Sequence, residues 1–245
     1  MSRPVAGAPA VKRGEVARLV VLDDSRSFAA EAYRVLRTNL HYANPDAPIR
    51  RLLVTSAGEG EGKSTTVANL GVCFAQADRA ALLIDTDLRR PVINTFFRQP
   101  ATPGLSSYLA GDALFEAIIQ KTSVPNLSII ASGPTPPNPA ELVGSRRMRE
   151  LLDAASERFD MILLDSPPVL AVSDAGALVP MVDGVLLVVG SGLTARLALR
   201  RAKEAVEAVQ GRIVGAVLNR FDASAQGYSR RYYDRYESYY TKRNG

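Results

Sequence analysis

The chain has very little cysteine, no tryptophan and no long apolar run. Cys73 is the single cysteine among 245 residues, which excludes an internal disulfide framework and is typical of a reducing compartment. No apolar run approaches the roughly 18 residues that a membrane-crossing helix needs. The start, MSRPVAGAPAVKRGE, lacks the apolar centre of a secretory signal. We therefore expect a cytoplasmic protein.

The chain also lacks a strong excess of either charge. Its net charge is +5, with 22% charged and 47% hydrophobic residues, as in an ordinary globular protein with one core. A charge of this size permits anionic partners but does not require nucleic acid, and we expect no nucleic-acid partner.

Short apolar runs alternate with stretches of helical periodicity through most of the chain. We expect strands at 51–56, 80–86, 127–132, 160–166, 184–190 and 213–219. We expect helices from Ser25 or Ser27 to about Asn44 and at 63–77, 139–158, 173–181 and 194–210. This alternation predicts an α/β fold with a doubly wound, mostly parallel sheet flanked by helices, whose strands are buried on both faces.

Two segments at the ends do not follow this alternation. Residues 1–24 are predicted to be a flexible lead-in, because their first part is rich in Pro, Gly and Ala. Residues 25–227 form the predicted domain, and residues 228–245 form a tail without apolar periodicity, which we expect to be flexible or loosely helical.

The loop AGEGEGKST, residues 57–65, follows a predicted strand and precedes a predicted helix. Glycines let backbone N–H groups approach phosphate oxygens, and the helix N-terminus adds its positive dipole end. Lys63 is expected to reach the β- and γ-phosphates and Ser64 to bind Mg²⁺. A chance Gly-Lys-Ser is the alternative, which the flanking strand and helix disfavour. The predicted nucleotide contacts are Gly58, Glu59, Gly60, Glu61, Gly62, Lys63, Ser64 and Thr65.

Three carboxylates follow two of the apolar strands. Asp85 and Asp87 end one strand, and Asp165 ends another. One such Asp is more often a turn residue or a helix cap. The two Asp of the first strand, being two apart, should point to the same side, and the carboxyl ends of the strands are where phosphates bind. The three together predict binding of a magnesium–nucleotide complex.

These motifs carry a family resemblance. The set AGEGEGKST, LLIDTDLRRP, GPTPPNPAELVGS and ILLDSPP, with a terminal tyrosine cluster, resembles the bacterial tyrosine kinases that control capsule and exopolysaccharide synthesis. The resemblance runs from about Ser25 to the C-terminus. Partition and septum-placing ATPases share single elements, but their loop usually carries a second lysine where this chain has Gly58. The resemblance implies a fold of the P-loop NTPase type and an ATP-dependent protein-tyrosine autokinase. A partition-type ATPase that switches dimerisation and a non-catalytic ATP-binding scaffold of polysaccharide export stay open as alternatives.

The resemblance also implies roles for individual residues. Lys63, Asp85 and Asp87 would be catalytic, with Asp85 as the base that accepts the proton of the tyrosine hydroxyl. Ser64, Asp87 and Asp165 would hold Mg²⁺, and Asn219 would approach the adenine of ATP. Arg89 and Arg90 are either solvated charges or contacts to phosphate or to another subunit.

The last eighteen residues contain six of the nine tyrosines, interleaved with charged side chains. A segment that binds nucleic acid or a membrane surface is one interpretation. The resemblance implies autophosphorylation sites instead, at Tyr228, Tyr232, Tyr233, Tyr236, Tyr239 and Tyr240.

Glu31, Arg34 and Arg37 recur every three residues on one predicted helix face. A surface ion-pair ladder is the simple interpretation. The resemblance implies that this pattern contacts the next subunit of a homo-oligomeric ring, in which tails are donated between subunits. It also implies a membrane-spanning polysaccharide co-polymerase as activator, which recruits the chain to the inner face of the plasma membrane, and a tyrosine phosphatase.

Overall fold

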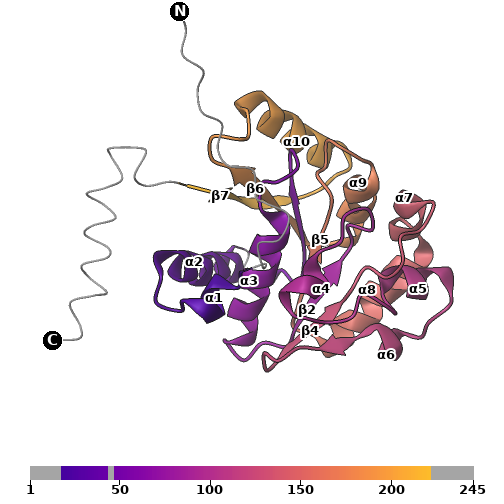
Figure 1. Cartoon of the computed structure of the whole chain (residues 1–245). Helices are drawn as coiled ribbons and strands as arrows, with labels where there is room; N and C mark the ends of the chain where they lie inside the picture. The colour runs from indigo at the N-terminus through magenta and orange to yellow at the C-terminus, as the bar shows by residue number, and fades with distance from the viewer. Residues whose placement is uncertain (1–17, 44–46, 222–245) are drawn as a thin grey trace, which may run out of the picture.

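The computed structural model describes residues 18–43 and 47–221, and these residues form a seven-stranded sheet in the order β3-β4-β2-β5-β1-β6-β7 (Figure 1). Neighbouring strands are parallel except β3 and β4. The strands are β1 (Arg51–Ser56), β2 (Ala81–Asp85), β3 (Gln120–Lys121), β4 (Leu127–Ile130), β5 (Met161–Asp165), β6 (Gly184–Gly190) and β7 (Ile213–Asn219). The doubly wound, mostly parallel α/β fold is confirmed.

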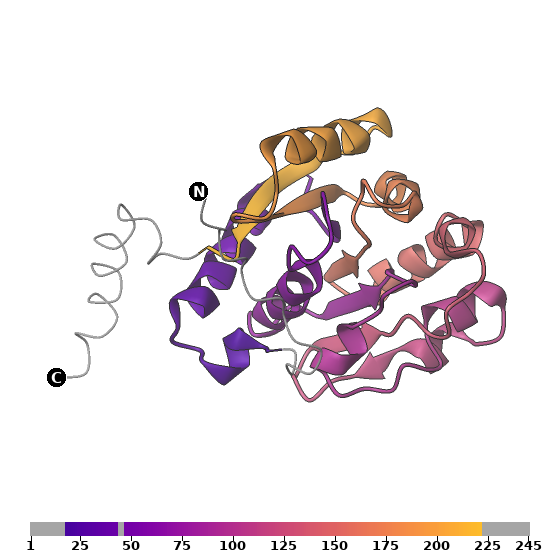
Figure 2. The same ribbon diagram turned by 45° about the horizontal axis from the view of Figure 1, so that its top comes forward.

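Helices cover both faces of the sheet, as Figure 2 shows. Leu52 and Leu53 follow one another in β1 and enter two different hydrophobic clusters, because successive side chains of a strand point to opposite faces. The helices are α1 (Val20–Asp23), α2 (Phe28–Tyr42), α3 (Lys63–Ala75), α4 (Ile93–Phe96), α5 (Leu105–Ala110), α6 (Phe115–Ile118), α7 (Pro139–Val143), α8 (Arg146–Arg158), α9 (Asp174–Leu178), the short 3₁₀ helix η1 (Val179–Met181) and α10 (Arg196–Ala208).

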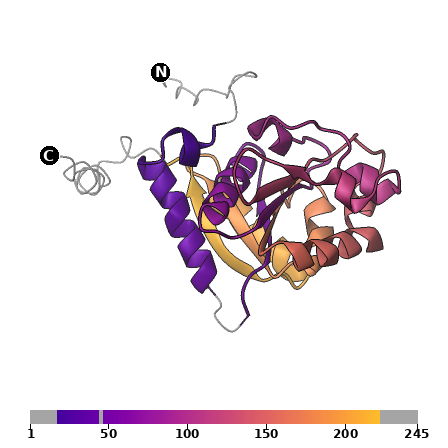
Figure 3. The ribbon, with the colours of Figure 1, turned by 90° about the horizontal axis from the view of Figure 1, so that it is seen from below.

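Strand β7 differs from the expectation that all strands are buried on both faces. It lies at the edge of the sheet, and its residues are half-buried or exposed, with Leu218 at 57% exposure. Helix α2 runs along this edge (Figure 3). Tyr33 and Leu36 of α2 and Val214 and Val217 of β7 pack against the same core cluster. An apolar run alone does not distinguish a central strand from an edge strand.

The predicted helix 139–158 is wrong in one respect, because it is two helices. The first ends at Val143 and is followed by Gly144, and Ser145 caps the second by accepting a hydrogen bond from the N–H of Met148 at 3.3 Å. The predicted helix 173–181 similarly changes to a 3₁₀ turn near Pro180.

Part of the predicted lead-in belongs to the folded domain. Leu19, which precedes α1, and Val21, which lies in α1, are both buried. The N–H of Val21 donates to Asn69 Oδ1 at 3.1 Å. Helix α2 then begins after Ser27, whose hydroxyl accepts from the N–H of Ala30. None of the helices within residues 18–43 and 47–221 is long and apolar enough to cross a membrane.

Candidate functional site

The loop between β1 and α3 has a backbone that requires glycine at its end. Gly62 has φ +94°, and a Cβ there would lie 1.9 Å from Nδ2 of Asn219. That nitrogen donates to the carbonyl oxygen of Glu61 at 2.9 Å. The carboxyl end of β7 thus packs directly against the loop. Asn219 lies beside the loop backbone in this structure, and contact with an adenine stays a prediction.

Glu61 is buried inside the loop. Its Oε1 accepts the N–H of Gly58 at 2.9 Å, and its side chain is 2% exposed. Its other oxygen, Oε2, has no hydrogen-bond partner among the described residues. The side chain of Glu61 therefore holds the shape of the loop.

A cavity of about 230 Å³ opens beside this loop at the carboxyl edge of the sheet. Three segments line it: the loop and the start of α3, the segment after β2, and the segment after β5. The lining residues are Glu59, Gly60, Lys63, Ser64, Asp87, Arg89, Arg90, Val92, Pro167, Pro168, Ala171 and Val172. Five residues of the predicted site therefore line one cavity. Gly58, Glu61 and Asn219 are joined by hydrogen bonds behind it, and Gly62 and Thr65 do not line it.

Two buried carboxylates lie next to this cavity on neighbouring strands. Asp85 of β2 and Asp165 of β5 are register partners, and both side chains are almost completely buried. Oδ2 of Asp85 accepts the N–H groups of Val92 and Ile93, each at 2.9 Å. Oδ1 of each aspartate has no hydrogen-bond partner among the described residues. Two negative charges held this close in a protein interior are costly.

The pKa values of the pair follow from this position. Burial raises the pKa of Asp85 to about 7, partly offset by the two backbone N–H groups. Burial also raises the pKa of Asp165 well above its usual range, and the charge of Asp85 raises it further. A hydrogen bond with Ser64 and the charge of Lys63 oppose this shift. The pair is therefore suited to hold a proton or a cation.

Asp87 is placed differently from the prediction. It lies beyond the end of β2, so the alternation of a strand does not place it on the same side as Asp85. Its Oδ1 accepts the N–H groups of Arg89 and Arg90, at 3.2 and 3.0 Å, and the side chain lines the cavity. The turn therefore directs Asp87 toward the cavity while Asp85 stays in the core.

Arg89 and Arg90 are held by ion pairs across the site. Nη2 of Arg89 lies 3.2 Å from Oδ2 of Asp174, whose side chain is 2% exposed. Arg90 pairs with Glu59 of the loop. Asp174 was absent from the sequence prediction, because its only local signal is that of an Asp in the first turn of a helix. The structure thus links both arginines to other segments of the site.

No three His, Cys, Asp or Glu side chains form a preformed metal cage in the part of the chain that the structure describes. This does not argue against Mg²⁺, which in phosphate-binding sites takes one or two carboxylates together with substrate phosphates. The partnerless buried oxygens of Asp85 and Asp165 and the hydroxyl of Ser64 are hard oxygen donors of the required kind.

Comparison with known proteins identifies the family. Residues 52–216 match the family model described as AAA domain. The chain is 42% identical over 201 residues to the tyrosine-protein kinase YwqD of Bacillus subtilis, covering 82% of this chain and 85% of that relative. The chain belongs to the bacterial tyrosine kinase family of P-loop NTPases.

Solved structures agree with this membership. The chimerical protein CapA2B2 is 35% identical to this chain with a TM-score of 0.80, covering 83% of this chain and 89% of that one. The kinase domain of the Escherichia coli tyrosine kinase ETK is 34% identical with a TM-score of 0.79, covering 87% and 86%. The P-loop and the cavity beside it therefore belong to a domain with the fold of the bacterial tyrosine kinases.

The predicted oligomer contacts lie on α2, away from the cavity. Nη1 of Arg34 pairs with Glu31 at 3.0 Å, and its Nη2 donates to the carbonyl oxygen of Ser25 at 2.6 Å. Arg37 donates to the carbonyl oxygen of Cys73 at 3.1 Å. Contacts within the chain therefore already engage all three side chains, and their part in a ring stays a prediction. The six tail tyrosines lie outside the described residues.

Proposed function

We propose that this chain is an ATP-dependent protein-tyrosine autokinase that acts in the control of capsular or exopolysaccharide polymerisation and export. The observation that carries this proposal is the cavity that Lys63 and Ser64 of the P-loop line together with Asp87, next to the paired strand ends of β2 and β5. The acceptors are the tyrosines of residues 228–245, where six lie within eighteen residues.

The reaction transfers the γ-phosphoryl group of ATP to a phenol oxygen. That oxygen attacks the γ-phosphorus, the bond to the β-phosphate oxygen breaks, ADP leaves, and the phenol proton passes to a carboxylate. A phenol has a pKa near 10, so it needs an acceptor for this proton. Lys63 stabilises the negative charge on the β- and γ-phosphates, and the loop N–H groups orient them.

Asp85 is the proposed proton acceptor. Its pKa of about 7 suits a group that takes a proton at neutral pH. Asp87 is the alternative, because it lines the cavity whereas Asp85 is buried. The variants Asp85→Asn and Asp87→Asn distinguish the two: the true acceptor is the one whose loss lowers phosphotransfer while ATP binding persists.

Mg²⁺ would be held by Ser64, Asp87 and Asp165, and when bound it neutralises phosphate charge. The buried, partnerless Oδ1 of Asp165 supports this assignment. Asp165→Asn should therefore weaken the magnesium-dependent part of ATP binding more than the magnesium-independent part. Calorimetric titration with ATP, with and without Mg²⁺, measures both.

Assembly into a ring and contact with two partners complete the proposed function. Glu31, Arg34 and Arg37 would contact the next subunit of a ring, so that each tail enters a neighbour's site. A membrane-spanning co-polymerase would activate the kinase at the inner face of the plasma membrane, and a phosphatase would reset it.

The deciding experiment is incubation of the full chain with Mg-ATP, followed by phosphotyrosine mapping by mass spectrometry. Phosphotyrosine should form within residues 228–245 and should be absent in Lys63→Met, which loses the charge at the β- and γ-phosphates. ADP formation without phosphotyrosine, even with a membrane activator present, would instead support a partition-type ATPase. ATP binding without turnover would support a scaffold.

A further inference from the structure

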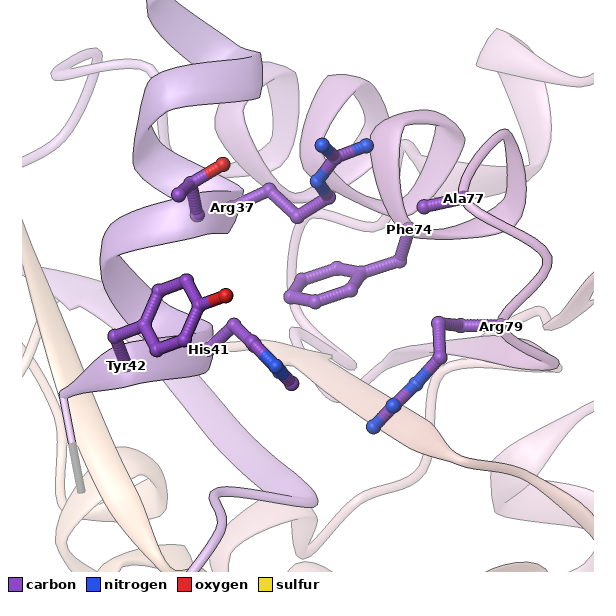
Figure 4. A pocket seen from close by; sticks show the side chains of 7 residues that line it. Arg37, His41, Tyr42, Phe74, Ala77 and Arg79 are labelled. Atoms are coloured by element: carbon purple, nitrogen blue, oxygen red, sulfur yellow. The ribbon is translucent and has the colours of Figure 1, made fainter. Parts of the chain in front are cut away.

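A second cavity lies at the opposite end of α3 from the nucleotide site. Its volume is about 300 Å³, and side chains from the end of α2, from α3 and from the turn after α3 line it. Figure 4 shows Arg37, His41, Tyr42, Phe74 and Arg79 around it, with the ring of Phe74 between the guanidinium groups of Arg37 and Arg79. Helix α3 has 13 residues, so the two cavities are separated by roughly 20 Å.

The charge of this second cavity is positive. Two arginines line it, and no Asp or Glu of the described residues does. The carbonyl ends of α2 and α3 contribute partial negative charge nearby, but Arg37 already donates to one of those carbonyls, that of Cys73. A guanidinium has five N–H donors, so Arg37 keeps others for a ligand.

Arg79 supplies the observation that points to an anionic ligand. Its Nε is buried and has no hydrogen-bond acceptor among the described residues. A buried N–H of a charged group without an acceptor is costly, and the cost disappears when an anion binds. An arginine in this state, in a cavity that a second arginine lines and no carboxylate of the described residues lines, favours binding of an anion.

The remaining lining indicates an aromatic ligand. Phe74 and Tyr42 present rings, and His41 packs edge-on against Tyr42 with 4.8 Å between ring centroids. The volume is at the lower end for small-ligand sites, which matches one aromatic group with a charged end. From this combination we infer that the cavity between α2 and α3 binds phosphotyrosine, and that the phosphorylated tail of this chain is its occupant.

The tail is long enough to reach this cavity, and phosphorylation changes its charge from positive to negative. It follows β7, whose Asn219 lies at the start of α3, and the 24 residues from 222 to 245 extend to at most roughly 80 Å. Unmodified, residues 228–245 carry five Lys or Arg and two acidic side chains, so two arginines repel them. Each phosphotyrosine adds about −1.5 to −2 charges, so three of them reverse the sign of the tail and make it attractive to the two arginines.

This inference rests on the proposed autokinase only for the source of the phosphotyrosine. It adds to that activity a site that binds the phosphorylated product. Arg37 belongs both to the predicted ring contact and to this cavity, so a seated phosphotyrosine would compete with the neighbouring subunit for the same side chain.

The test uses the unphosphorylated full chain with excess Mg-ADP, which occupies the nucleotide site. Calorimetry measures the binding of phenyl phosphate, of inorganic phosphate, and of a synthetic peptide of residues 228–240 with and without phosphate on its tyrosines. The phosphopeptide and phenyl phosphate should bind, and inorganic phosphate and the unmodified peptide should bind at least roughly tenfold more weakly, because they lack the ring or the charge.

The variants assign the binding to this cavity. Arg79→Gln should weaken phosphopeptide binding by roughly tenfold or more, because it removes a charged donor. His41→Ala, on the exposed end of α2, should weaken it as well. Arg149→Gln, which removes an exposed arginine of α8, is the matched control and should change nothing. Thermal unfolding checks that each variant is folded.

Several results would overturn the inference. One is equal phosphopeptide affinity in wild type, Arg79→Gln and His41→Ala, and another is equal binding of modified and unmodified peptide. Arg79-dependent binding of phosphatidylserine vesicles without binding of phenyl phosphate would make this a lipid site. Because the peptides are synthetic, phosphopeptide binding by a chain that forms no phosphotyrosine of its own would support the cavity and overturn only the autokinase.

Discussion

At the scale of single residues, the buried pair of Asp85 and Asp165 makes the stability of the folded chain depend on pH. The pKa of Asp85 is about 7 in the folded chain, against 3.8 for an ordinary aspartate. The folded state therefore binds more protons than the unfolded state between these values. The free energy of unfolding should fall as pH rises from about 4 to about 7.

Asp85→Asn should remove much of this pH dependence. The amide oxygen can still accept the N–H groups of Val92 and Ile93, and the NH₂ group replaces the partnerless Oδ1. At pH 8, without nucleotide and with a metal chelator, the variant should be more stable than wild type by on the order of 2–4 kcal/mol, and the difference should shrink toward pH 5. Denaturant unfolding at several pH values measures this.

The control for charge removal alone is Asp112→Asn, at an exposed position. It should follow the wild-type pH profile. Parallel profiles for wild type and Asp85→Asn would show that Asp85 is charged at no cost in the folded protein.

A second residue-scale prediction concerns the contact between the loop and β7. Gly62→Ala introduces a Cβ at a positive φ and 1.9 Å from Asn219 Nδ2, so it should cost about 1–3 kcal/mol of stability and weaken ADP binding. Asn219→Ala removes the obstructing side chain and loses one hydrogen bond, at about 1 kcal/mol.

The double variant Gly62→Ala/Asn219→Ala should be more stable than the sum of the two single effects allows, because the clash is gone while the backbone strain persists. Denaturant unfolding of the four proteins gives this double-mutant cycle. Additive effects would mean that the loop moves away from β7 without cost.

At the scale of elements, α2 carries both a contact within the chain and a proposed contact between chains. The double variant Glu31→Arg/Arg34→Glu reverses both charges but keeps an i, i+3 pair, a type of pair worth about 0.2–0.5 kcal/mol. The unfolding temperature should change little, although the bond from Arg34 to the Ser25 carbonyl oxygen is lost. If α2 contacts a neighbour, light scattering should show a smaller species.

The matched control is the reversal of another helical ion pair, Lys203→Glu/Glu207→Lys on α10. It should leave the mass of the assembly unchanged. Equal masses for wild type and the α2 variant would contradict the assembly role of α2.

At the scale of the whole molecule, phosphorylation should change the assembly through the charge of the tail. Three modifications reverse the sign of residues 228–245, which carry five basic and two acidic side chains when unmodified. A tail of this charge is repelled by the carboxylate-containing nucleotide site and by other modified tails, over a range limited by salt. In Mg-ATP the wild type should therefore disperse from a ring.

A variant with all six tail tyrosines replaced by phenylalanine keeps the aromatic rings and removes the acceptor hydroxyls. It should stay assembled under the same conditions, as measured by light scattering over time. Dispersal of both proteins at the same rate would show that tail charge does not control assembly.

The sequence by itself determined the features that depend on residues close to one another along the chain. The P-loop, the six apolar strands and the Ser27 helix cap were all predictable, because glycine spacing, apolar periodicity and capping act over a few residues. The motif set also indicated the family, which comparison with known proteins confirmed.

Only the tertiary structure decided which distant residues meet. The order of the strands brings Asp85 beside Asp165, and the edge position of β7 brings Asn219 against Gly62. The pair of Arg89 with Asp174 and the cavity between α2 and α3 arise in the same way. Strand order and helix packing are set by burial of the whole core, and no local pattern in the sequence encodes them.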